Sequence, residues 1–160
     1  MSETKKRLPV LKQTPEEEQG EGPRPAWHWV GFGACATFGV ALPLSYVTQV
    51  ITARLLPNEP LPPEAAIAIN FAPILIAGFL GGMLVGRWGG DNAGVREAAF
   101  AGGIAQLLMV ILAIAQNPGM PGWQPYAIWA AMICFVSIAA AIGGKVGLRR
   151  RIKKMTPNLR

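Results

Sequence analysis

Four long blocks of apolar residues, separated by short polar segments, dominate this chain of 160 residues. The blocks run approximately over residues 29–53, 65–88, 95–115 and 126–148. A helix that crosses a membrane needs about 20 consecutive, mostly apolar residues, and each block reaches that length. The pattern therefore predicts an all-α integral membrane domain, residues 27–148, built from four transmembrane helices.

Composition favours the membrane class over a soluble domain. Apolar residues make up 51% of the chain and charged residues only 15%, whereas soluble domains carry about 25% charged residues. The chain also contains 19 glycines, and glycine is more frequent in transmembrane helices than in soluble ones.

Two segments of the chain are nearly the same. IAGFLGGMLVGRW spans Ile76–Trp88, and IAAAIGGKVGLRR spans Ile138–Arg150. They align without a gap at an offset of 62 residues, and the same offset places Phe38 on Phe100. The similarity predicts two helical hairpins that are related as parallel repeats.

Small residues recur in these segments at intervals of four, as in Gly82 with Gly86 and Gly143 with Gly147. Small residues allow helix backbones to approach closely in lipid, where van der Waals contact drives association. We expect these faces to pack, either within the chain or against a partner. The predicted packing residues are Gly78, Gly81, Gly82, Gly86, Gly102, Gly103, Gly143, Gly144 and Gly147.

Positive charge is concentrated in the predicted C-terminal tail, residues 149–160. Basic residues flank the cytoplasmic ends of transmembrane helices, so four spans place both termini in the cytoplasm and the protein in the inner (cytoplasmic) membrane. Residues 1–26, rich in Pro and Glu, are predicted to be a disordered cytoplasmic tail. The predicted topology anchors, which would also bind anionic lipid headgroups, are Arg149, Arg150, Arg151, Lys153 and Lys154.

Polar residues within the blocks are few, and no unpaired Asp, Glu, Lys, Arg or His lies in the middle of a span. Proton relays and ion-coupled transporters generally need an ionisable group there. The candidate polar positions are Ser45, Gln49, Thr52, Asn70 and Gln106. Gln49 and Asn70 are expected at similar depth, where a hydrogen bond between them would contribute roughly 0.6 kcal/mol. These polar residues would then hold helices together; the alternative is that they line a polar groove or contact a partner.

No catalytic or metal-binding motif is recognisable. Cys35 and Cys134 both fall inside apolar blocks and are interpreted as buried small residues rather than a disulfide. With a single histidine, they form no metal-ligand set, and no phosphate-binding loop or nucleophile motif occurs. The sequence predicts no enzyme activity, no cofactor, no metal and no nucleic-acid partner.

The segment GFLGGMLVGRWGGDNAGVREAAFAGG, residues 78–103, joins a Gly-Gly…Gly-Arg helix end to a Gly-rich turn and an Ala/Gly-rich helix. In this it resembles the central part of small four-helix integral membrane proteins of prokaryotes. The resemblance implies a four-helix membrane architecture and no particular activity.

The small size, the Gly/Ala contact faces and the polar tails predict a non-catalytic accessory or scaffold subunit of a larger membrane assembly. Its partners would be membrane lipids and other membrane subunits or further copies of itself. The alternative is a small oligomeric transporter or channel for a small solute.

Overall fold

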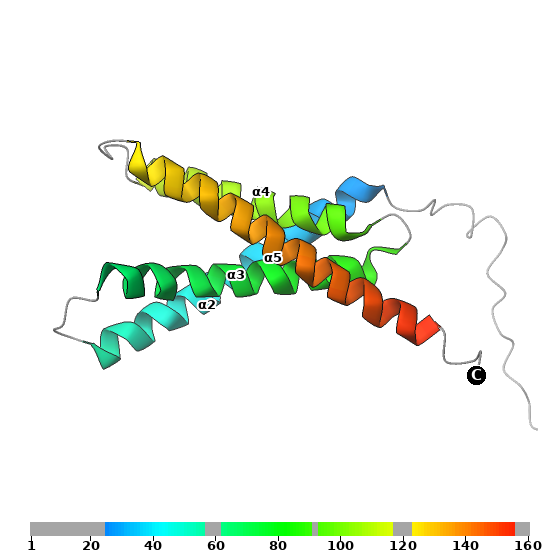
Figure 1. Cartoon of the computed structure of the whole chain (residues 1–160), viewed down its shortest axis with the longest axis horizontal. Coiled ribbons are helices and arrows are strands. Elements are labelled where there is room, and N and C mark those ends of the chain that lie inside the picture. The colour runs from blue at the N-terminus through cyan, green and yellow to red at the C-terminus, as the bar shows by residue number, and fades with distance from the viewer. Residues whose placement is uncertain (1–24, 57–61, 91–92, 117–122, 156–160) are drawn as a thin grey trace, which may run out of the picture.

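A computed structural model describes residues 25–56, 62–90, 93–116 and 123–155, and this part of the chain is helical (Figure 1). Four helices are each long and apolar enough to cross a membrane, which indicates a multi-pass membrane protein. The predicted all-α class with four candidate spans is therefore confirmed. Of the two predicted tails, residues 1–24 and 156–160 lie outside the described part of the chain. The helices are α2 (Ala26–Leu55), α3 (Pro63–Trp88), α4 (Val95–Gln116) and α5 (Gln124–Met155).

The helix α5 is longer than the hydrophobic pattern predicts. It continues to Met155, seven residues beyond the predicted boundary at 148. Hydropathy marks where the apolar stretch ends, whereas the helix itself continues because arginine and lysine are good helix formers. Arg149, Arg150 and Arg151 consequently lie on the helix rather than in a separate tail.

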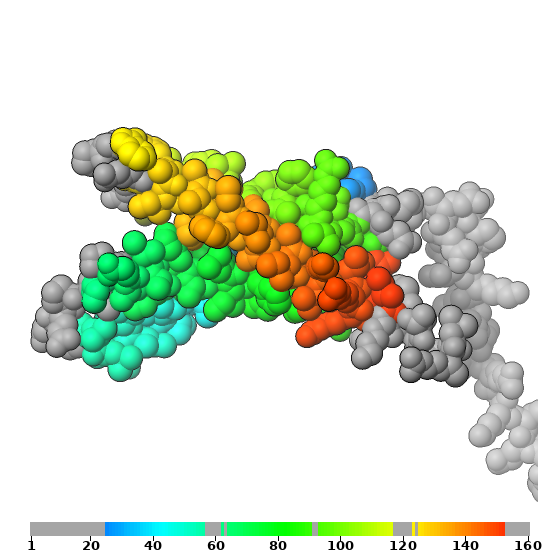
Figure 2. Space-filling view, in the orientation of Figure 1, coloured from blue at the N-terminus to red at the C-terminus, as the bar shows by residue number. Residues whose placement is uncertain are grey.

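The four helices form a bundle in which neighbours along the chain run in opposite directions (Figure 1). The most extensive contact joins α3 and α5, and the middle of α5 crosses the C-terminal half of α3 (Figure 1). In addition, α2 packs on α3 and α4, and α4 packs on α5. In the space-filling view, the atoms of α5 (orange) run between those of α3 and α4 (Figure 2). We call the end where α2 and α4 begin and α3 and α5 finish the basic end.

Small side chains occupy the interior, and large ones face outward. Among the described residues, Val85 and Val136 are the largest fully buried side chains, and most of the others in the core are alanines. Long apolar side chains such as Ile111, Phe135 and Ile138 are more than half exposed. This arrangement suits a membrane, because lipid solvates the outward apolar side chains while small residues let the helices approach.

Described residues on both sides of the α3–α4 connection show how α3 ends and α4 begins at the basic end. Gly90 has a φ of +61°, a left-handed conformation that glycine adopts without steric cost. Four residues after Gly90, the backbone N–H of Gly94 donates a hydrogen bond of 2.7 Å to the Glu97 carboxylate. This bond satisfies a free donor at the start of α4, as in half of a capping box.

Candidate functional site

The glycine-rich segments of α3 and α5 pack directly against each other. At four of these glycines, a Cβ atom would fall on a backbone carbonyl oxygen of the opposite helix, far inside contact distance. The four pairs of glycine and facing carbonyl are Gly82 with Ala140, Gly86 with Gly144, Gly143 with Phe79, and Gly147 with Met83. In each pair a glycine Cα–H points at a carbonyl, the geometry of a weak Cα–H···O hydrogen bond.

These contacts are reciprocal. A shift of 61 residues converts the pair Gly82–Ala140 into Phe79–Gly143, with the two helices exchanged. The sequence similarity has an offset of 62 residues because it superimposes the two Gly-Gly pairs. The packing has an offset of 61 residues because it relates Gly82 and Gly86 to Gly143 and Gly147. Both helices thus present the same backbone surface to each other.

The remaining predicted glycines also meet groups of this chain. Gly81 lies against Thr37 of α2, and a Cβ on Gly103 would approach the Ser137 hydroxyl of α5. Gly78 and Gly102 both face Val136, while Gly144 also faces Ala98. The sequence did not show whether these glycines pack within the chain or against a partner. In the structure they pack within the chain.

One small-residue face was missed by the sequence analysis and remains open. A Cβ on Gly31 or Gly39 of α2 would meet nothing within 4 Å, and Cys35, between them, is exposed. These three residues are spaced at four and so share one face of α2, which we call the α2 glycine face. The spacing is visible in the sequence and would have identified it. Cys134 is also exposed and both cysteines are free, so the predicted burial of the cysteines is wrong.

An apolar groove adjoins the α2 glycine face. It lies between α2 and α4 and has a volume of about 420 Å³. Cys35 and Gly39 belong to both surfaces. The lining residues are Ala34, Cys35, Phe38, Gly39, Leu108, Ile111 and Leu112.

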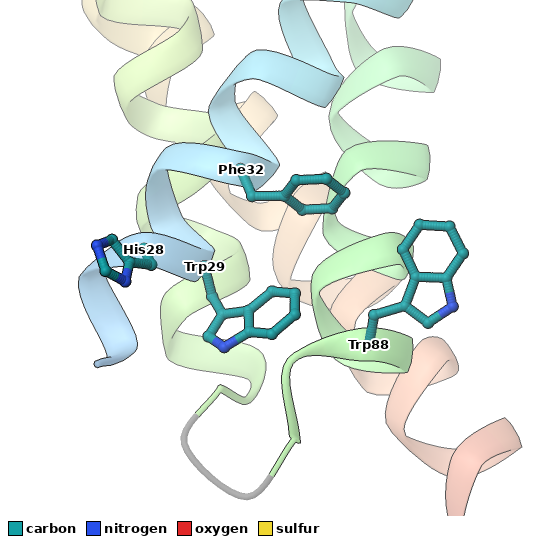
Figure 3. A pocket seen from close by; sticks show the side chains of 4 residues that line it. All are labelled: His28, Trp29, Phe32 and Trp88. Atoms are coloured by element: carbon teal, nitrogen blue, oxygen red, sulfur yellow. The ribbon is translucent and has the colours of Figure 1, made fainter. Parts of the chain in front are cut away.

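A second cavity lies at the basic end and is lined by aromatic rings. It has a volume of about 350 Å³ and is formed by His28, Trp29, Phe32 and Trp88. Trp29 and Phe32 project from the first turns of α2 toward the end of α3, which carries Trp88 (Figure 3). The Phe32 and Trp88 ring centroids are 6.1 Å apart. Amphipathic rings at helix ends are typical of the headgroup zone of a membrane.

The polar positions inside the spans do not form one site. Asn70 donates from Nδ2 to the Ala66 carbonyl of its own helix at 2.8 Å, in place of the predicted bond to Gln49. Thr52 likewise bonds the Thr48 carbonyl, while Gln49 is exposed and Ser45 is half-buried.

Two buried polar side chains each have an oxygen atom that forms no hydrogen bond. Thr37 is 2% exposed and Gln106 is 5% exposed. Thr37 Oγ1 and Gln106 Oε1 have no hydrogen-bond partner. Thr37 is absent from the predicted polar set, because an isolated threonine in an apolar block gives no signal of its depth.

The predicted arginine anchors divide into three environments. The Arg151 guanidinium donates a bond of 2.5 Å to the Gly90 carbonyl and so ties α5 to the α3–α4 turn. The Nη1 atom of Arg150 lies 3.9 Å from the Met83 sulfur of α3, and Arg149 is exposed. The side chains of Lys153 and Lys154 lie outside the described part of the structure.

The described residues contain no group of three or more His, Cys, Asp or Glu side chains that could hold a metal ion. Comparison with protein-family models, curated proteins and solved structures found no match. The resemblance to small prokaryotic four-helix membrane proteins therefore stays a prediction, and the site must be interpreted from its own geometry.

Proposed function

We propose that this protein is a non-catalytic accessory or scaffold subunit of a larger membrane assembly. The observation that carries the proposal is the open α2 glycine face. The glycines spaced at four on α3 and α5 are covered by neighbouring helices, whereas a Cβ added at Gly31 or Gly39 would meet nothing within 4 Å.

A helix face of this kind suits a partner helix better than it suits lipid. Small residues at intervals of four let another backbone approach closely, as the α3–α5 contact does within this chain. The adjoining groove between α2 and α4 extends the recess and is lined by apolar side chains. A transmembrane helix of another subunit, or of a second copy, would cover the α2 glycine face and fill the groove.

The two native cysteines provide matched positions for a test. Cys35 lies on the α2 glycine face, and Cys134 is exposed on α5. A photo-reactive residue at position 35 should give one cross-linked protein product of discrete mass in native membranes, and the same residue at 134 should react with lipid. Equal products from both positions would contradict the proposal, as would migration in mild detergent as a lone species with no stoichiometric partner.

We further propose that the protein lies in the inner membrane with both termini in the cytoplasm and that its two hairpins are parallel repeats. Basic residues of the described part gather at the basic end, whereas Arg54 and Glu64 are the described charges at the opposite end. This distribution follows the positive-inside rule. A green fluorescent protein fused to the C-terminus should fluoresce, and an alkaline phosphatase fusion there should be inactive; the reverse result would refute the orientation.

The second candidate is a small oligomeric transporter or channel. It is favoured by Gln49 and Asn70, which are both exposed on candidate membrane spans and would line a pore only between copies. This candidate predicts solute uptake or conductance in liposomes. Gln49→Leu and Asn70→Leu should each reduce that flux, and full retention would count against it.

A further inference from the structure

The glycine contact between α3 and α5 brings two arginines of different helices to one place at the basic end. Arg87 follows Gly86 on α3, and Arg150 follows Gly147 on α5. Both are adjacent to Met83: the Arg150 guanidinium lies 3.9 Å from its sulfur, and Arg87 is one helical turn beyond it on the same face. A Cβ on Gly147 would lie 2.9 Å from the Arg87 backbone nitrogen, which shows how closely the helix ends approach.

These two guanidinium groups have no neutralising carboxylate in the described part of the chain. The carboxylates described are Glu64, at the start of α3 and hence at the opposite end, and Glu97, which holds the Gly94 N–H. The Met83 thioether is only a weak acceptor. Both arginines are exposed, and two positive charges on neighbouring helix ends attract an anion.

The surface next to the pair selects the kind of anion. On α3, Ile76, Met83 and Arg87 share one face, because seven and eleven residues correspond to about two and three helical turns. Ile76 is 50% exposed, so an apolar strip leads directly from the arginines into the depth of the candidate span. Guanidinium groups match the geometry of phosphate oxygens, and the apolar strip matches an acyl chain.

We propose that Arg87 and Arg150 together bind the phosphate of an anionic phospholipid, whose acyl chain lies along the Ile76–Met83 face of α3. Arg151 is excluded from this role because it holds the Gly90 carbonyl. Arg149 is one residue from Arg150 and therefore points about 100° away around the helix. Of the three consecutive arginines of α5, Arg150 alone contributes to the lipid site, and Arg87 of α3 supplies the second guanidinium.

The test compares lipid binding to the purified full-length protein by native mass spectrometry, with phosphatidylglycerol and phosphatidylcholine as probes. Arg87→Gln and Arg150→Gln should each lower the preference for the anionic lipid about tenfold, the factor that corresponds to the loss of ~1.5 kcal/mol for one hydrogen bond to a charged group. Arg149→Gln, the matched control, should leave the preference within twofold of the unmodified protein. An equal loss in Arg149→Gln would show diffuse attraction and refute the site.

Two further experiments distinguish a lipid phosphate from free phosphate and check that the variants are folded. Inorganic phosphate at the same concentration should not displace phosphatidylglycerol; displacement would refute binding of a lipid as such. Arg150→Lys keeps the charge and should retain more of the preference than Arg150→Gln, with an unchanged far-UV circular dichroism spectrum in both. A loss as large in Arg150→Lys as in Arg150→Gln would contradict electrostatic recognition at this position.

Discussion

The substitution Gly82→Ala tests the reciprocal contact between α3 and α5. The new methyl group would meet the carbonyl oxygen, carbonyl carbon and Cα of Ala140, which are backbone atoms that cannot rotate away. The helices must therefore separate, and the separation weakens the neighbouring glycine–carbonyl pairs as well. A matched substitution, Gly39→Ala, places the same methyl where nothing lies within 4 Å.

The expected size follows from the contacts. Four Cα–H···O interactions at roughly 0.5–1 kcal/mol each amount to about 2–4 kcal/mol, and the higher helix propensity of alanine offsets roughly 1 kcal/mol. We expect Gly82→Ala to lower the free energy of unfolding by about 1–3 kcal/mol, in the range typical of overpacking. Gly39→Ala should leave it unchanged or raise it by up to about 1 kcal/mol.

The assay is equilibrium unfolding in mixed micelles with increasing dodecyl sulfate, followed by circular dichroism. Gly143→Ala should match Gly82→Ala, because the two glycines exchange roles across the contact. The double variant should lose less than the sum of the single losses, since the first methyl already separates the helices. If Gly82→Ala and Gly39→Ala were equally stable, the contact would not have the structure described above.

Three further predictions use the same unfolding assay. Arg151→Ala removes the bond to the Gly90 carbonyl and should cost about 1 kcal/mol, with faster amide exchange in the α3–α4 turn; unchanged exchange there would contradict the role of Arg151. Glu97→Ala removes the acceptor for the Gly94 N–H and should cost about 0.5–1 kcal/mol, whereas Glu97→Gln should retain most of the stability, and equal losses would argue against capping. Thr37→Val replaces a buried hydroxyl that has no partner and should be neutral or stabilising; a loss above about 1 kcal/mol would mean that the hydroxyl is satisfied in the membrane.

The hydrophobic pattern predicted the four spans well because membrane crossing demands an unbroken apolar length, which the sequence displays directly. It did not show that α5 continues to Met155, beyond the predicted end of the span at 148, since hydropathy reports the end of the apolar stretch and Arg149 does not stop a helix. It identified Gly82 and Gly86 as contact residues but not their partner, because small-residue spacing carries no information about which helix lies opposite.

The hydrogen-bond partners of the polar residues could not be predicted from the sequence. Asn70 was expected to bond Gln49 across the helices, but its amide reaches the Ala66 carbonyl one turn earlier on α3. Such local bonds compete with interhelical ones and cannot be excluded from spacing alone. The approach of the Arg87 backbone to Gly147 was equally hidden, because it depends on how closely two glycine faces meet.

The pairing of α3 with α5 also has a consequence for biogenesis. A chain that enters the membrane from its N-terminus inserts α3 before α5 has been synthesised, so the Gly82–Gly86 surface has no cover until the last helix arrives. The bundle therefore closes late, and α5 completes it. A polypeptide that stops after α4 would expose on α3 the same surface that α5 recognises, and it would compete for the α5 of an intact neighbour.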